Sequence, residues 1–346
     1  MADYWFRIAV TAGVVAVLSA ALVPAARRIA FHFSVIDHPK PGKFHHRVTP
    51  YLGGLAIVPV AALASQFLPH WKAEVVVIAF AALMVAAVGL VDDVRTLSPA
   101  PRLAVEAVAA SAVFFVGARV DVFGGPADYV LTVGWLVVLT NSFNLLDNMD
   151  GCAGLIAVVM ATGMAVAAGM QGQVLVGGMA ALVAGACLGF LPANWHPASI
   201  FMGDTGSLFL GFILATLSLK LRFPVSHAES ISALLLIAGP VLFDTTLVVL
   251  SRLRAGRPIY IGGTDHTSHR LMRLGLPVPA VAGLLGGAVA VCTALGVAVG
   301  HNALPATAVL AVMLAVGVVA LILLLRLPLP DNAGREEAAV PTVATA

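Results

Sequence analysis

The chain has 346 residues, of which 60% are hydrophobic and 10% are charged, and its mean hydropathy is +1.00. Soluble domains carry about 25% charged residues, so this composition excludes an ordinary soluble protein and indicates an integral membrane protein. The net charge of +2 predicts no nucleic-acid partner. The three cysteines lie in apolar segments and lack the spacing of a disulfide framework or a zinc site.

Apolar segments of about twenty residues, the length that crosses a bilayer core about 30 Å thick, recur along the chain. We therefore predict an all-α, polytopic membrane protein with about eleven transmembrane helices, forming one domain over residues 1–330. A cleaved signal peptide is the alternative for the first segment, but that segment is long enough to stay as a helix. The predicted spans are 5–26, 50–68, 73–91, 103–119, 128–144, 152–170, 173–193, 206–222, 231–251, 278–299 and 303–325.

The basic residues are distributed unequally between the two sides that these spans define. All but five of the 19 Lys and Arg residues fall on one side. By the positive-inside rule that side is cytoplasmic, so the amino terminus is expected outside and the carboxyl terminus in the cytoplasm. Residues 331–346 are polar and are expected to form a disordered cytoplasmic tail. The polar motifs described next then all lie at the cytoplasmic face, apart from one acid inside a span.

The first cytoplasmic loop, residues 31–50, is rich in Pro, Gly, Lys and His. Lys43 and His45 are candidate phosphate ligands, and Gly53-Gly54 would allow the backbone to approach the phosphate closely. A basic loop without a binding role is the alternative interpretation.

Asp92 and Asp93 stand side by side where the third apolar segment ends. Adjacent carboxylates repel each other, and at the carboxyl end of a helix they also face the negative end of its dipole. A solvated helix cap is the alternative, but acids favour the amino ends of helices. A metal ligand or a general base explains this pair better.

Residues 141–151 form the densest polar block in the chain. On a helix, Asn141 and Asn144 share one face, and Asp147 and Asp150 lie at its flank. Carboxylate and amide oxygens are hard ligands that suit Mg²⁺ rather than Zn²⁺. A polar seam between helices is the alternative.

Three further polar features lie in the second half of the chain. Asp204, between two glycines, opens the eighth span and is either an ordinary helix cap or a metal ligand near a phosphate. Asp244 lies inside the ninth span and is either a buried hydrogen-bond anchor or a functional acid. Residues 262–271 combine two glycines with His266, His269 and Arg270, a set suited to binding a diphosphate.

Together these blocks resemble the polyprenyl-phosphate N-acetylhexosamine-1-phosphate transferases, in family order from Asp37 to about Leu271. The resemblance implies eleven helices in the bacterial cytoplasmic membrane and a Mg²⁺-dependent site facing the cytoplasm, with Mn²⁺ as a substitute. It also implies transfer of a sugar 1-phosphate from a UDP-sugar to a lipid phosphate such as undecaprenyl phosphate, with release of UMP.

The same resemblance implies a role for each matching position. Asp92 and Asp93 match the paired aspartates at the lipid-phosphate site. Asn144 and Asp204 match the positions associated with the metal. The positions near the nucleotide or the diphosphate are matched by Asp147, Asp150, His266, His269 and Arg270. Lys43, His45 and Asn141 are the expected contacts to the lipid phosphate or the rest of the substrate.

Two departures from the family pattern lie in loops expected to contact substrate. The usual His-x-His-His becomes residues 266–269, which retain two histidines, and the usual Arg-Lys before the first-loop histidine becomes Gly42-Lys43. These changes leave the sugar open, although the pattern is closer to the branch that uses GlcNAc than to phospho-MurNAc-pentapeptide translocase. The expected pathway is cell-envelope polysaccharide synthesis, and the glycine-rich helices are compatible with a homodimer. An ion-coupled secondary transporter is the alternative from another class, but it requires acids near mid-bilayer and internal repeats.

Overall fold

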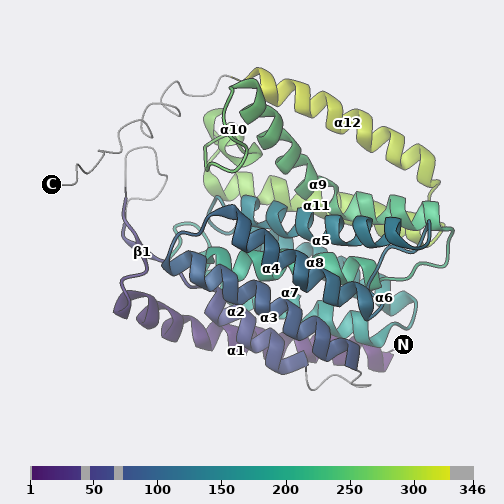
Figure 1. Cartoon of the computed structure of the whole chain (residues 1–346), viewed down its shortest axis with the longest axis horizontal. Helices are drawn as coiled ribbons and strands as arrows, with labels where there is room; N and C mark the ends of the chain where they lie inside the picture. Colours follow the sequence, from purple (N-terminus) through teal and green to yellow (C-terminus); the bar gives the residue numbers. More distant parts are fainter. Residues whose placement is uncertain (1, 40–46, 66–72, 328–346) are drawn as a thin grey trace.

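The computed structural model describes residues 2–39, 47–65 and 73–327, which form a bundle of helices with one short two-stranded ribbon. In chain order the elements are α1 (Ala2–His32), β1 (Ile36–Asp37), β2 (Thr49–Pro50), α2 (Gly54–Ser65), α3 (Ala73–Val94), α4 (Pro99–Phe115), α5 (Pro126–Leu146), α6 (Cys152–Met170), α7 (Val174–Asn194), α8 (Gly203–Lys220), α9 (His227–Arg254), α10 (Thr267–Arg273), α11 (Val278–Gly300) and α12 (Ala306–Arg326). Figure 1 shows their arrangement. The strands pair antiparallel, with Ile36 opposite Pro50.

Each predicted span coincides with one helix, and α10 is an additional short helix within a segment expected to be polar loop. Among the described residues, eight helices are long and apolar enough to cross a membrane, which confirms a polytopic all-α membrane protein. The other three matching helices are shorter or carry polar ends: α2, α4 and α8. The number of crossings and the orientation of the termini stay predictions, and the tail 331–346 lies outside the described residues.

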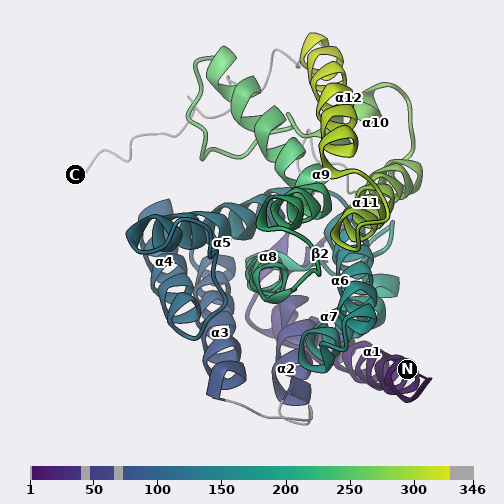
Figure 2. The same cartoon turned by 90° about the vertical axis from the view of Figure 1, so that its right-hand side faces the viewer.

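Helix α8 is the central element of the bundle. Every residue of α8 from Thr205 to Leu219 is buried, and α8 packs against α2, α3, α5, α6 and α7. Figure 2 shows α8 enclosed by these helices. A helix that is covered on all sides is expected to be largely apolar around its whole circumference, as α8 is after its first turn. The hydroxyls of Thr216 and Ser218 donate to backbone carbonyls of the same helix.

Glycines bring α8 close to its neighbours near its amino end. A Cβ atom on Gly89 of α3 would overlap the carbonyl of Asp204, and one on Gly54 of α2 would overlap the amide nitrogen of Gly206. Small residues of this kind allow helix backbones in membranes to approach closely. They place the carboxyl end of α3 directly against the first turn of α8.

Helix α12 has the opposite environment. It packs on α9 and, more weakly, on α11, and Ala306 is its only buried side chain among the described residues. Figure 2 shows α12 at the edge of the bundle, and the first half of α12 packs against Ala233 and Leu236 in the amino half of α9.

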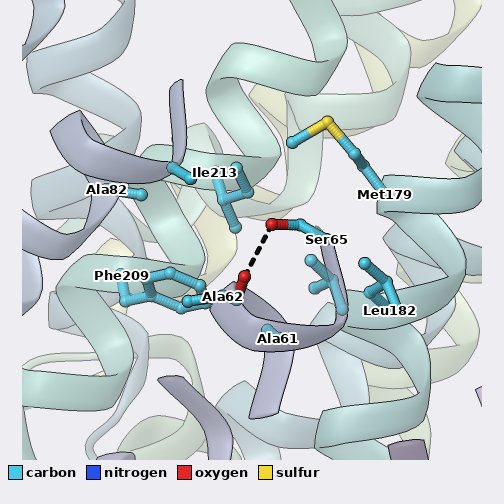
Figure 3. A pocket seen from close by; sticks show the side chains of 10 residues that line it. Ala61, Ala62, Ser65, Ala82, Met179, Leu182, Phe209 and Ile213 are labelled. Carbon is cyan, nitrogen blue, oxygen red and sulfur yellow. Dashed lines mark hydrogen bonds between the residues drawn. The ribbon is translucent and has the colours of Figure 1, made fainter. Parts of the chain in front are cut away.

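A small, mostly apolar cavity lies between α2, α3, α7 and α8 (Figure 3). Ser65 is the polar side chain of its lining, and its hydroxyl donates to the carbonyl of Ala62 at 2.7 Å. None of the predicted site residues lines this cavity, so it carries no argument about the chemistry.

Candidate active site

Four helix ends meet at the predicted site: the carboxyl ends of α3 and α5 and the amino ends of α4 and α8. Asp93, from the end of α3, supplies the first link. Its Oδ1 accepts a hydrogen bond from the backbone N–H of Asp204 (2.7 Å), and its Oδ2 accepts from the N–H (3.0 Å) and hydroxyl (2.6 Å) of Thr205. Asp93 therefore caps α8, and the positive end of the α8 dipole stabilises a carboxylate that its own helix disfavours.

Asp92 closes the turn between α3 and α4. Its Oδ1 accepts a hydrogen bond from the N–H of Leu97 at 2.7 Å, and its Oδ2 accepts from Nη1 of Arg102 at 3.1 Å. The two adjacent aspartates thus have separate partners, one in α8 and one in α4. This separation resolves the repulsion that the sequence predicts for them.

Arg102 is the central cation of the site. In the sequence it counted only as one of the basic residues that predict how the chain is oriented in the membrane. Its Nη1 lies 3.4 Å from Oδ2 of Asp204 as well as 3.1 Å from Asp92, and its Nη2 lies 3.5 Å from Oδ1 of Asn141. Pro99 and Pro101 start α4 and set Arg102 in its first turn. One guanidinium therefore bridges a predicted catalytic residue and a predicted metal ligand.

Glu106 is a second residue of the site that was not among the candidates predicted from the sequence. It is fully buried on α4, one turn after Arg102, and its Oε2 accepts a hydrogen bond from Nδ2 of Asn141. A signal was present, because Glu106 is an acid inside the predicted span 103–119, and such acids are functional candidates by default.

The two residues expected to bind a metal are in direct contact. Nδ2 of Asn144 donates to Oδ1 of Asp204 at 2.8 Å and to the hydroxyl of Ser207 at 3.0 Å. No three His, Cys, Asp or Glu side chains within the described ranges are arranged to hold an ion by themselves. This donor set fits Mg²⁺ nonetheless, because Mg²⁺ is usually bound by one or two carboxylates together with substrate phosphates.

Asp147 and Asp150 follow α5 and have different environments. Burial, followed by the charges of Asp204, Asp93 and Asp150, raises the pKa of Asp147 to about 8. Oδ2 of Asp150 accepts a hydrogen bond from the N–H of Ala198 (3.0 Å) and lies 2.8 Å from Nδ1 of His196. Asp147 therefore lies among the site carboxylates, whereas Asp150 ties the turn after α5 to the loop before α8.

The histidine segment forms the start of α10. Asp244 of α9 accepts a hydrogen bond from the N–H of Thr267 (2.7 Å) and lies 2.9 Å from Nδ1 of His266, so it is the anchor of this segment. Burial and the neighbouring His266 lower the pKa of His269 to about 4, which keeps its imidazole neutral at pH 7. The hydroxyl of Ser268 donates to Oδ1 of Asn148 at 2.5 Å. This contact places the segment beside the acidic turn after α5.

Arg270 does not have the environment expected of a diphosphate ligand. Its side chain is buried, and its Nη1 donates to the carbonyls of Leu324 (2.6 Å) and Leu327 (3.2 Å) at the end of α12. Its Nη2 donates to the hydroxyl of Ser251 (2.7 Å) and its Nε to the carbonyl of Asp265 (3.1 Å). These contacts use the guanidinium to fasten α10 to α9 and α12, and the diphosphate role of Arg270 stays a prediction.

The segment between α1 and α2 contacts the residues just before α8. The N–H groups of Gly53 and Gly54 donate to the carbonyls of Phe201 (2.9 Å) and Met202 (2.8 Å), just before α8. The ring of Tyr51 packs on that of Phe201, with centroids 5.6 Å apart. Lys43 and His45 lie outside the described residues, so their predicted phosphate contacts stay predictions.

Comparisons with known proteins find a matching family model and several similar proteins. A family model described as "Glycosyl transferase family 4" matches residues 75–222, the segment that contains α3 to α8. The chain is 34% identical over 281 residues to a probable undecaprenyl-phosphate N-acetylglucosaminyl 1-phosphate transferase of Bacillus subtilis, covering 77% of this chain and 78% of that protein.

Two further relatives have names of the same kind. A decaprenyl-phosphate N-acetylglucosaminephosphotransferase of Mycolicibacterium smegmatis is 32% identical over 289 residues, covering 72% of this chain and 71% of that protein. A phospho-N-acetylmuramoyl-pentapeptide-transferase of Trichormus variabilis is 30% identical over 250 residues, covering 65% of each protein. All three similarities extend over most of both chains.

Proposed function

The chain belongs to glycosyl transferase family 4, and from this premise we propose that it transfers GlcNAc 1-phosphate from a UDP-sugar to undecaprenyl phosphate and releases UMP. Transfer of an amino-sugar phosphate to a polyprenyl phosphate is the activity named for its relatives. The observation that carries the proposal is Arg102, whose Nη1 faces both Asp92 and Asp204, while Asp204 also accepts a hydrogen bond from Asn144.

The reaction must bring a lipid phosphate up to a diphosphate within an acidic pocket. Asn144 and Asp204 would hold Mg²⁺, or Mn²⁺ in its place, whose chemistry there is to offset the negative charge of the diphosphate and of the leaving UMP. Arg102 lies beside both carboxylates and offers further N–H donors, so it would receive the lipid phosphate. His266 and His269 would border the diphosphate from α10.

We assign separate roles to the paired aspartates. Asp92 orients Arg102 and, through it, the lipid phosphate, while Asp93 fixes the first turn of α8 and with it Asp204. An oxygen of the lipid phosphate attacks the sugar-linked phosphorus, a new P–O bond forms, and the bond to the UMP oxygen breaks. A phosphate with a second pKa of about 6 is largely dianionic at pH 7, so little deprotonation is needed. An aspartyl-phosphate route requires two displacements and therefore retention at phosphorus, whereas direct attack gives inversion.

The test is UMP release by purified protein supplied with undecaprenyl phosphate, UDP-GlcNAc and Mg²⁺, with and without a chelator. We expect lipid-dependent, chelator-sensitive UMP. Turnover with another UDP-sugar instead of UDP-GlcNAc would assign a different sugar within the same reaction. No turnover with any UDP-sugar, UDP-MurNAc-pentapeptide included, by well-folded protein would refute the transferase. Ion-dependent uptake into liposomes without a lipid acceptor would support the transporter alternative.

A location in the bacterial cytoplasmic membrane, with the site facing the cytoplasm, follows from the basic residues near the site. Arg95 and Arg102 border the acidic site, and Arg252, Arg254, Arg257, Arg270 and Arg273 cluster around α10. The helix ends that form the site therefore belong on the cytoplasmic side by the positive-inside rule.

A further inference from the structure

The carboxyl group of Glu106 is the most buried acid next to the site, and the mechanism above does not use it. Glu106 is 0% exposed, and it lies on α4 within an apolar segment. Placing a carboxyl group in that environment costs free energy, so such an acid is expected to pair with neighbouring polar or charged groups. Two neighbours contact it, and both belong to the site: Asn141 and Arg102.

The contact with Asn141 fixes the direction of an amide. The backbone carbonyl of Val137 can only accept a hydrogen bond, so the side of the Asn141 amide that faces Val137 and Glu106 is the NH₂ group. That NH₂ group donates to Oε2 of Glu106 and to the carbonyl of Val137 at 2.9 Å. The carbonyl oxygen of the same amide then faces Nη2 of Arg102 at 3.5 Å. Glu106 and the Val137 carbonyl together turn the acceptor side of Asn141 toward the guanidinium.

The contact with Arg102 acts on the other edge of the same guanidinium. Oε1 of Glu106 lies 3.9 Å from Nε of Arg102, one helical turn away. This distance is that of an ion pair without a hydrogen bond. A guanidinium is planar, so this attraction at its Nε edge and the Asn141 contact at Nη2 also favour one direction of Nη1. That nitrogen faces Asp92 at 3.1 Å and Asp204 at 3.4 Å.

We propose that Glu106 is a positioning residue for the transfer reaction: through the amide of Asn141 and the edge of Arg102, it holds the guanidinium between Asp92 and Asp204. This inference rests on the proposed function of the site. Glu106 contacts neither substrate nor metal in this account, and it acts only through these two residues. Its role extends the functional part of α4 one turn beyond Arg102.

The first test compares two replacements of Glu106 in the full-length protein. Glu106→Gln keeps an acceptor oxygen for Asn141, so kcat should stay within about threefold of wild type. Glu106→Met keeps the length of the side chain but removes the acceptor, so kcat should fall about 100-fold while KM for the UDP-sugar changes less than threefold. Ser111→Ala, on the same helix but bonded to Tyr129, is the matched control and should match wild type.

The second test exchanges the hydrogen-bonding partners. Asn141→Asp alone sets two carboxylates against each other and should lower kcat about 100-fold. The double variant Glu106→Gln with Asn141→Asp restores a donor opposite an acceptor and again presents an oxygen to Arg102. It should recover kcat to within about tenfold of wild type. A double variant that is folded and no more active than Asn141→Asp alone would overturn the proposal.

A readout independent of turnover separates this inference from the proposed function. The rise in melting temperature caused by Mn²⁺ should persist in Glu106→Gln, shrink in Glu106→Met, and return in the exchanged double variant. A lower melting temperature of Glu106→Met with unchanged kcat would show a merely structural role and would also overturn the proposal. Absence of UMP release by wild type, with the Mn²⁺ pattern intact, would refute the transferase and leave the positioning role standing.

Discussion

Two regions of the molecule hold charged side chains at the same end of the bundle, and they are balanced in different ways. Around the first turn of α8, the carboxylates of Asp92 and Asp204 share one guanidinium, that of Arg102, while Asp93 bonds to the amino end of α8 and Asp147 lies among these negative charges. Around α10, by contrast, Asp265 accepts hydrogen bonds from both Arg252 and Arg257. The first region has excess negative charge, and the second is neutralised or positively charged by its own residues.

The difference separates a site that awaits a ligand from a framework that supports it. Carboxylates that repel each other lower the free energy of unfolding, and a bound cation can offset this loss. Their presence together therefore favours a cation-dependent function. Buried pairs such as Arg252 with Asp265 satisfy each other and need nothing further. The sequence motifs predicted ligand contacts in both regions, with a metal and the lipid phosphate at the first and a diphosphate at the second.

The largest predicted effect is on the α8 region. Asp204→Asn should lower kcat/KM by about 1000-fold or more, because it removes the carboxylate expected to hold the metal. The melting temperature should stay the same or rise, since one repelling charge is gone. UMP release and thermal unfolding on the same preparation test both statements. A large loss of stability would show that the carboxylate cluster is a structural feature.

The converse result is predicted for α10. Asp265→Asn leaves the buried guanidinium of Arg252 without its bidentate partner, and breaking a buried pair costs about 3–5 kcal/mol. Thermal unfolding in detergent should show a clear fall in melting temperature. The kcat of the folded fraction should change far less than for Asp204→Asn. Equal loss of activity in both variants would break the distinction between the regions.

Arg102→Lys tests the bridge within the acidic region. Lysine keeps the charge but cannot contact Asp92, Asp204 and Asn141 from one planar group. We expect kcat/KM to fall about 30-fold, with the larger part of the change in KM for the lipid phosphate. Steady-state kinetics with the two substrates varied separately would show the split. A change confined to KM of the UDP-sugar would assign Arg102 to the donor instead.

Metal affinity should depend on pH through Asp147. The raised pKa of about 8 means that Asp147 is mostly protonated at pH 7 in the metal-free protein. A cation bound at neighbouring Asp204 favours the ionised form, so binding releases a proton below about pH 8. Affinity should rise as pH increases from about 6 to 8, by at most about tenfold per pH unit. Calorimetry in buffers of different ionisation enthalpy measures the released proton, and a flat pH dependence would contradict this account.

The smallest effect is expected at Arg270. Arg270→Lys loses part of the link to the end of α12, so the melting temperature should fall by a few degrees. KM for the UDP-sugar should change less than twofold, because the guanidinium is buried among protein groups. A large and selective rise in that KM would restore the diphosphate role that the sequence suggested.

The sequence predicted the helices well, because each apolar run has to cover its own backbone within a bilayer. It also identified Asp93 and Asp204, but only as members of separate polar blocks. The contact between these two residues depends on the close approach of α3 to α8 at Gly89. Arg102 and Glu106 were missed because these two charges, one turn apart on α4, belong to none of the polar motifs. Their importance appears only when α4 is placed beside α5.

The histidine segment shows the opposite limit. The residue types of the block were suited to binding a diphosphate, but their partners could not be read from spacing. Arg270 lies 54 residues before Leu324, whose carbonyl it binds, and Asp244 lies 22 residues before His266. Contacts over such separations are set by helix packing, so a basic residue next to a histidine can serve the framework.

The central claim, that the acidic end of α8 is a cation site, is tested most directly by Mn²⁺ titration followed by electron paramagnetic resonance, without substrates. The account predicts one saturable Mn²⁺ per chain that Mg²⁺ displaces, that is lost in Asp204→Asn, and that is retained in Ser111→Ala. No saturable Mn²⁺, or binding unchanged in Asp204→Asn, would contradict it.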